Sequence, residues 1–382
     1  MKNKGRQSKS GADSRQRVRY AVVGLGYISQ SAVLPAFAHA RTNSQLVGLV
    51  SDDPQKLAEL GAKYDVLPEN CCSYSEFDTF LQKGTVDAVY IALPNNMHCD
   101  FTIRAARQGV HVLCEKPMAI TDDECVRMIR TTDDERVKLM IAYRLHFNPA
   151  NLIAVEVAQS GRLGALRHFE SVFSMNVKAG DIRLQRALGG GTLYDIGIYC
   201  INAARYLFRA EPLEVSAMST RSEDPRFREV DETTSATLMF PEGRLASFTC
   251  SFGSADTAHY RLVGTEGELT LDAAYEIAEP MRLSVSANGK RSTRKFTRRD
   301  QFAPELMHFS DCIIHDRTPG PSGEEGQADV RIIEALYRSA AEGRAITLDS
   351  LPRIHARPSL EQAISRPPIR KPVLLGVSSP SM

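Results

Sequence analysis

The sequence predicts an α/β protein with an N-terminal doubly wound parallel sheet and a C-terminal α+β domain. The second domain is expected to hold a large, mostly antiparallel, open-faced sheet. Three observations indicate this fold: a glycine-rich turn directly after the first apolar run, strands and helices that alternate up to Tyr143, and long stretches after Pro149 in which apolar and polar residues alternate.

The first half contains five strand-like runs separated by helix-like segments. Strands are expected at Val18 to Val23, Leu46 to Val50, Val86 to Leu93, His111 to Cys114 and Val137 to Tyr143. Helices are expected near Ser31 to Ala40, Pro54 to Tyr64, Glu76 to Gln82, Cys99 to Gln108 and Thr121 to Thr132. The run Val86 to Leu93 is apolar throughout, which is typical of a strand buried on both faces.

The first strand leads into Gly24-Leu25-Gly26-Tyr27-Ile28-Ser29, a G-x-G-x-x-S turn. Gly24 would allow a tight turn and Gly26 a close approach of the backbone to a pyrophosphate, while the helix after Tyr27 and Ile28 would aim its N–H groups at the phosphates. Because this turn opens the first strand–helix unit, we predict a dinucleotide site formed by Gly24, Gly26, Tyr27 and Ile28.

The end of the second strand bears on the choice of dinucleotide. NAD-binding domains place an acid there for the ribose 2′-hydroxyl, whereas NADP-binding domains supply a donor or a cation. This chain has Ser51, which together with Lys56 suits a 2′-phosphate, although Asp52 would repel one. Asp53 is expected to cap the following helix. The pattern favours NADP and leaves NAD open.

A charged sequence, Glu115-Lys116-Pro117, follows the strand at His111 to Cys114. The carboxyl ends of parallel strands border the ligand crevice in such sheets. A solvated lysine at a strand end is the simplest interpretation of Lys116. A lysine held at the crevice would instead polarise a hydroxyl or carbonyl oxygen with its charge.

The second half begins with a helix from Asn148 to about Ser160 and continues with strands. They are expected at Leu166 to Asn176, Val215 to Thr220, Thr233 to Phe240, Arg244 to Phe252, Tyr260 to Val263 and Leu283 to Ala287. Helices are expected at Pro304 to His315 and Ala328 to Glu342. The domains therefore divide as 18–145 and 146–349, between a basic arm at 1–17, expected to be disordered, and a proline-rich tail at 350–382.

Three glycines at Gly189 to Gly191 precede a helix that carries Asp195 and Tyr199. Residues four apart share a helix face, so this acid and this phenol form a candidate proton-transfer pair. Alternatively, Asp195 is a first-turn acid favoured by the helix dipole and Tyr199 is a packing residue.

Composition excludes several classes of function. The net charge of +1 offers no global basis for binding nucleic acid or an anionic membrane, and no apolar run is long enough to span a bilayer. Eight cysteines show no C-x-x-C pair, so we expect free thiols and no metal site. The polar start of the chain has no export-signal pattern, and a cytoplasmic protein is expected.

Several motifs together resemble the glucose–fructose oxidoreductase, inositol dehydrogenase and rhizopine-catabolism family (GFO/IDH/MocA), closest to its glucose–fructose oxidoreductase branch. They are Gly24 to Tyr27, Ala88 to Asn95 with His98, Cys114 to Ala119, Tyr143-Arg144 with His146 and Pro149, Gly189 to Tyr199, and Pro321 to Gly326. The resemblance covers about Val18 to Asp349.

The resemblance implies a Rossmann domain and an NAD(P)-dependent enzyme that transfers hydride to or from a sugar or polyol. Lys116 would bind the reacting oxygen, Tyr199 would be the general acid/base, and Asp195 would hold substrate hydroxyls or tune the other two. The nicotinamide side would be lined by Leu93, Pro94, Asn95, His98, Glu115 and Arg144, and Ser51 and Lys56 would contact NADP. A homodimer or homotetramer through the C-terminal sheet is also implied.

The segment Asp181-Ile182-Arg183 lacks the tryptophan that contacts the cofactor in that branch, so a dissociable cofactor is expected. The alternative from another class is a non-catalytic NAD(P) sensor of the same fold. Such a sensor would be expected to lack Lys116 or Tyr199, and this chain has both.

Overall fold

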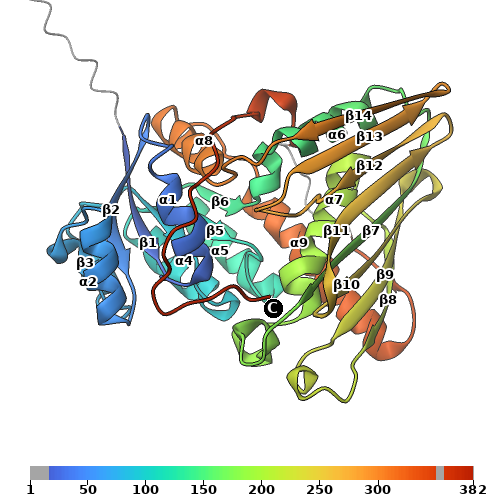
Figure 1. Ribbon diagram of the computed structural model, residues 1–382. Helices are drawn as coiled ribbons and strands as arrows, with labels where there is room; N and C mark the ends of the chain where they lie inside the picture. The colour runs from blue at the N-terminus through green and yellow to red at the C-terminus, as the bar shows by residue number, and fades with distance from the viewer. Residues whose placement is uncertain (1–16, 350–356, 382) are drawn as a thin grey trace, which may run out of the picture.

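Two β-sheets organise the molecule, with helices on both faces of the first and between the two (Figure 1). The computed structural model describes residues 17–349 and 357–381. The basic arm expected at 1–17 therefore lies, except for Arg17, outside the described residues, as does the part of the tail at 350–356.

The first sheet has six parallel strands in the order β3-β2-β1-β4-β5-β6. They are β1 (Val18–Val23), β2 (Ser44–Val50), β3 (Cys71–Cys72), β4 (Ala88–Ile91), β5 (His111–Glu115) and β6 (Leu139–Ala142). All four residues of β4 are buried, as its continuous apolar run predicts. The strand order reverses between β1 and β4, which is where doubly wound sheets bind ligands.

Helices from both halves of the chain cover this sheet. They are α1 (Leu34–Ala36), α2 (Pro54–Lys63), α3 (Phe77–Leu81), α4 (His98–Arg107), α5 (Asp122–Asp134) and, from the second half, α8 (Ala303–Ile314). In α8 the Ser310 hydroxyl lies 2.9 Å from the hydroxyl of Tyr20 and 2.7 Å from that of Ser44. A division at residue 146 thus describes the chain order, whereas α8 returns to pack on the first sheet.

The second sheet has nine strands in the order β14-β13-β12-β11-β7-β10-β9-β8-β15. They are β7 (Leu166–Asn176), β8 (Glu214–Thr220), β9 (Thr233–Phe240), β10 (Arg244–Ser251), β11 (Gly253–Gly264), β12 (Gly267–Asp272), β13 (Met281–Ala287), β14 (Lys290–Phe296) and β15 (Ile346–Thr347). Only β10 and β7 run parallel, so the expected mostly antiparallel sheet is confirmed.

One face of the second sheet is covered by three helices that stand between it and the first sheet, α6 (Pro149–Gln159), α7 (Ile198–Phe208) and α9 (Gly323–Glu342) (Figure 1). Leu207 of α7 and Leu238 of β9 are fully buried in this layer. Among the described residues, no helix combines the length and the apolar character needed to cross a bilayer.

Five strands depart from the sequence expectation. The sequence analysis did not predict β12, the edge strand β14 or the two-residue strands β3 and β15, and β11 begins at Gly253 rather than near Tyr260. Strand β14 has the sequence KRSTRKF and is exposed along almost its whole length, so it shows no apolar alternation. Its pairing with β13 is a property of the assembled sheet.

The described part of the C-terminal tail packs on its own chain. Arg366 donates from Nε to the carbonyl oxygen of His39, and its own carbonyl accepts from the backbone N–H of Asp300. In Figure 1 the tail, in dark red, runs across α1 and ends between the two sheets. The tail therefore spans the cleft between the domains.

Candidate active site

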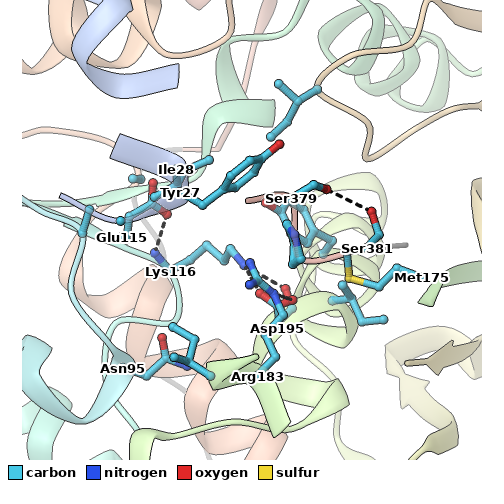
Figure 2. Close-up of a pocket in the computed structure, with 18 of the residues that line it drawn as sticks. Tyr27, Ile28, Asn95, Glu115, Lys116, Met175, Arg183, Asp195, Ser379 and Ser381 are labelled. Carbon is cyan, nitrogen blue, oxygen red and sulfur yellow. Dashed lines mark hydrogen bonds and ion pairs between the residues drawn. The ribbon is translucent and has the colours of Figure 1, made fainter. Parts of the chain in front are cut away.

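A cavity of about 910 Å³ lies between the two sheets, within the range of cofactor and substrate pockets. Every residue predicted to bind cofactor or substrate lines it: Gly24, Gly26, Tyr27, Ile28, Ser51, Lys56, Leu93, Pro94, Asn95, His98, Glu115, Lys116, Arg144, Asp195 and Tyr199. Figure 2 shows the Lys116 and Asp195 side chains meeting in this cavity, with Tyr27 and Ile28 on one side and Arg183 beneath.

The glycine turn after β1 has the shape that a dinucleotide requires. Gly24 has φ +94°, and a Cβ there would lie 2.5 Å from the carbonyl oxygen of Ala92, so only glycine fits. A Cβ on Gly26 would meet no protein atom within 4 Å, so the side that this glycine leaves bare is open to the cavity. Ser29 donates to the Gly24 carbonyl at 2.6 Å and holds the turn.

At the end of β2, the polar side chains that bear on the choice of cofactor point in different directions. Ser51 and Lys56 line the cavity, and the Lys56 amine lies 3.4 Å from the carboxylate of Asp53, which caps α2. Asp52 instead accepts a hydrogen bond from the backbone N–H of Tyr74 at 2.8 Å and does not line the cavity. These residues fit a 2′-phosphate, because Ser51 and Lys56 line the cavity and the carboxylate of Asp52 is engaged by the backbone of Tyr74.

Lys116 and Asp195 form an ion pair across the cleft. The Lys116 amine donates to the backbone carbonyl of Asp195 at 2.8 Å and to its carboxylate at 3.2 Å. Burial lowers the pKa of Lys116, but the neighbouring Tyr199, Asp195 and Glu115 outweigh it, so that the net pKa is raised. The amine is therefore a cation that is held in place.

Arg183 completes this ion pair, and the sequence did not single it out as a site residue. Its Nε donates to Asp195 at 2.6 Å, and its Nη1 lies 3.2 Å from Asp181. Burial raises the pKa of Asp195, but Arg183 and Lys116 together overcome this and lower it to about 2. The available sequence signal was an arginine shortly before the three glycines, in the segment Asp181-Ile182-Arg183.

The ring of Tyr199 lies between two cations. The Lys116 amine is 4.8 Å from the ring centroid, and the Arg144 guanidinium carbon is 5.1 Å from it. Arg144 is buried and donates to the Tyr275 carbonyl at 2.5 Å and to the side chain of Gln301. The amine of Lys116, the carboxylate of Asp195 and the phenol of Tyr199 therefore share one site, although Lys116 and Tyr199 come from different domains.

Two further predicted residues fix the loops at the strand ends. His98 is buried, with its ring nitrogens 2.9 Å from the carbonyl oxygens of Leu93 and Pro117, and it ties the ends of β4 and β5 together. Asn95 donates to the carbonyl of Gly189 at 2.8 Å and so joins the two domains at the cavity wall.

Glu115 lies behind Lys116. Its carboxylate accepts hydrogen bonds from the Tyr90 hydroxyl at 2.8 Å and from the Lys116 backbone N–H at 3.2 Å. Burial raises the pKa of Glu115. This carboxylate therefore orients the backbone from which the Lys116 side chain projects.

The geometry agrees with comparisons to known proteins. Residues 18–143 match a model described as an oxidoreductase family with an NAD-binding Rossmann fold, and residues 152–270 match the GFO/IDH/MocA C-terminal domain. The D-xylose 1-dehydrogenase (NADP(+)) 2 of Haloferax volcanii is 31% identical over 334 residues, which are 86% of this chain and 99% of that protein.

Two further relatives differ in what their names say they act on. The dTDP-3,4-didehydro-2,6-dideoxy-alpha-D-glucose 3-reductase of Saccharopolyspora spinosa is 30% identical, covering 84% of this chain and 97% of that protein. The crystal structure of aldose-aldose oxidoreductase from Caulobacter crescentus, complexed with glycerol, matches with a TM-score of 0.84 and 38% identity, covering 87% of this chain and 100% of that one.

Proposed function

Because the chain belongs to the GFO/IDH/MocA family of NAD(P)-binding oxidoreductases, we propose that it is a sugar or polyol dehydrogenase that uses Lys116, Asp195 and Tyr199. The observation that carries this proposal is the ion pair between Lys116 and Asp195 beside the Tyr199 ring, in the cavity that the Gly24–Ile28 turn enters. A cation, an acid and a phenol in one cleft are the groups that proton transfer to a hydroxyl or carbonyl requires.

Each of the three side chains has a distinct part in the proposed reaction. Lys116 donates a hydrogen bond to the reacting oxygen and stabilises negative charge there, while Tyr199 takes the alcohol proton or returns it. Asp195, held by Arg183, keeps the Lys116 amine in place and accepts from substrate hydroxyls. A nicotinamide held in the cavity would supply the hydride-transfer chemistry.

The cofactor that fits best is NADP. Ser51 and Lys56 face the cavity at the end of β2, and Asp52 is turned to the backbone of Tyr74. A relative at 31% identity is named for NADP(+). The same cavity is also lined by the residues that the resemblance assigns to the nicotinamide side, Leu93, Pro94, Asn95, His98, Glu115 and Arg144.

We also propose a homo-oligomer joined through the second sheet. Met218, Met239 and Leu245 are 72%, 38% and 47% exposed, and the strand register places them on the same face, opposite the helices. Exposed apolar groups on one sheet face are typical of an interface. Light scattering after size-exclusion chromatography tests this, and a monomer at all concentrations would contradict it.

The eight cysteines, which all lie in the described part of the chain, are free. Free thiols are typical of a reducing compartment, so we propose a cytoplasmic location.

The other candidate, a non-catalytic NAD(P) sensor, predicts cofactor binding without turnover. The test is a thermal-shift screen with NAD(H) and NADP(H), followed by a panel of aldoses, inositols and diols with the preferred cofactor. We expect NADP reduction with at least one aldose and its loss in Tyr199→Phe. Binding without turnover across the whole panel would favour the sensor.

A further inference from the structure

The C-terminal segment Val373 to Ser381 reaches the cofactor cleft, and neither the sequence nor the comparisons assign it a role there. Ser379, Pro380 and Ser381 line the same cavity as Gly26, Tyr27 and Lys116. Figure 2 shows Ser379 and Ser381 across the cavity from Lys116. The segment therefore supplies part of the wall of the site.

One end of this segment is fastened to the Rossmann domain, beside the glycine turn. Gln30 is 1% exposed and pairs with Leu375 twice: it accepts from the Leu375 backbone N–H at 2.7 Å and donates to the Leu375 carbonyl at 3.0 Å. The backbone N–H of Gln30 in turn donates to the carbonyl of Gly26. The Lys63 amine donates to the Val373 carbonyl at 3.2 Å.

The other end is fastened to the second sheet. Lys178, just past β7, donates from its backbone N–H to the Pro380 carbonyl at 2.9 Å and from its amine to the Ser379 carbonyl at 3.0 Å. Val177 and Ser381 form an antiparallel bridge. Pro380 is buried.

Between these attachments the chain passes beside Lys56, which lines the cavity. Gly376, with φ +61°, passes so close to Lys56 that a Cβ there would lie 3.4 Å from the lysine side chain. Lys56 is the residue that suits the 2′-phosphate, and Gly26 is the residue whose bare side faces the cavity. A dinucleotide that extends from Lys56 to Lys116 would therefore lie beneath this segment.

We propose that residues 373–381 form a cover over bound NADP(H), and that this cover must detach from the second sheet before the cofactor can enter or leave. The inference rests on the proposed function. It predicts slow cofactor exchange, contrary to the dissociable cofactor expected from the missing tryptophan. Detachment from the second sheet requires the two hydrogen bonds from Lys178 to Ser379 and Pro380 to break, together with the bridge between Val177 and Ser381.

The experiment compares NADPH binding and release by stopped-flow fluorescence in the full chain and three variants. A chain ending at Pro372 removes the cover, Lys178→Ala removes one attachment, and Lys290→Ala is the matched control because Lys290 is exposed on β14, away from the cavity lining. We expect both the association and the dissociation rates to rise at least about tenfold in the truncated chain, and about threefold in Lys178→Ala. Lys290→Ala should match the full chain.

The two rates separate a cover from a mere contact. A cover slows entry and exit together, whereas a binding contact slows exit alone. A rise in the dissociation rate only, or no change in either rate, would overturn the proposal while leaving the proposed function intact. Failure of the full chain to bind either NADPH or NADH would overturn both.

Discussion

Two glycine-led turns face the same cavity and use their glycines in opposite ways. Gly24 to Ile28 leads into a π-helical turn at Ser29–Val33, and Gly189 to Gly191 leads into another at Leu193–Gly197. At Gly26 a Cβ would meet open space, whereas at Gly190 it would lie 2.4 Å from the carbonyl oxygen of Arg183. The first turn leaves room for a ligand, and the second leaves room for its own chain.

The two turns therefore have different roles: the first is suited to bind a phosphate, and the second positions Arg183 and Asp195. The first turn has no acid in its first helical turn, as suits a phosphate, and the second has Asp195 there. Because Gly190 packs against Arg183, the second turn brings Arg183 to Asp195, and Asp195 holds Lys116. A glycine-rich turn in a sequence thus indicates that another group lies close to the backbone, and only the structure shows whether that group is a ligand or the chain itself.

The largest effect on activity is expected from loss of Lys116, the amine that Asp195 of the second turn holds in place. Lys116→Ala should lower kcat by ~10²–10⁴-fold, the range for loss of an acid–base contribution. The fold should persist, because Asp195 keeps its bond to Arg183. Lys138→Ala, which removes an amine paired with Asp316 at the surface, is the control and should leave kcat unchanged. Retained turnover in Lys116→Ala would show that the assignment is wrong.

A pair of glycine variants tests the comparison directly. Gly26→Val should raise the NADPH dissociation constant at least about tenfold, or ~1.4 kcal/mol, while the free energy of unfolding without cofactor stays within about 0.5 kcal/mol. Gly190→Ala should lower that free energy by about 1–3 kcal/mol through overpacking against Arg183, with a smaller change in cofactor affinity. Fluorescence titration and urea denaturation measure the two quantities. Similar results for both variants would remove the distinction between the turns.

Acid should reveal the charge pairing at the second turn. The pKa of Asp195 is lowered to about 2, so the stability that it contributes is present above its unfolded pKa near 3.8 and is lost as the pH falls toward 2. Wild type should therefore lose on the order of 2 kcal/mol relative to Asp195→Asn over this interval. Urea denaturation between pH 5 and pH 2.5 measures it.

The matched control for this measurement is Asp100→Asn, which changes a carboxylate that is 67% exposed on α4. This variant should follow the wild-type pH dependence. Parallel curves for wild type and Asp195→Asn would argue against an ionised Asp195 held by Arg183 and Lys116.

The smallest effect is expected on the preference for NADP over NAD, which we assign to Lys56. Lys56→Ala should weaken NADP binding by ~fivefold, about 1 kcal/mol, because the amine is already shared with Asp53. NAD affinity in the same variant is the internal control and should stay unchanged. Equal losses for both cofactors would mean that Lys56 does not contact the 2′-phosphate.

Much of the fold was predictable because it depends on local patterns. The unbroken apolar run of β4, the Asp53 cap with Pro54 after it, and the glycines at Gly24 and Gly26 each need only a few neighbouring residues. Strand β14 was not predictable, since its charged sequence lacks alternation and its place depends on β13.

The sequence by itself determined which residues can do chemistry, and the predicted Lys116, Asp195 and Tyr199 do meet in one cavity. Only the tertiary structure decided the long-range contacts around the cavity. Arg183 binds Asp195, the backbone of Tyr74 binds Asp52, and Leu375 of the tail binds Gln30. The physical reason is distance along the chain. Periodicity and capping arise between near neighbours, whereas the contact between Lys116 and Asp195 joins residues 79 positions apart and exists only once both domains have packed.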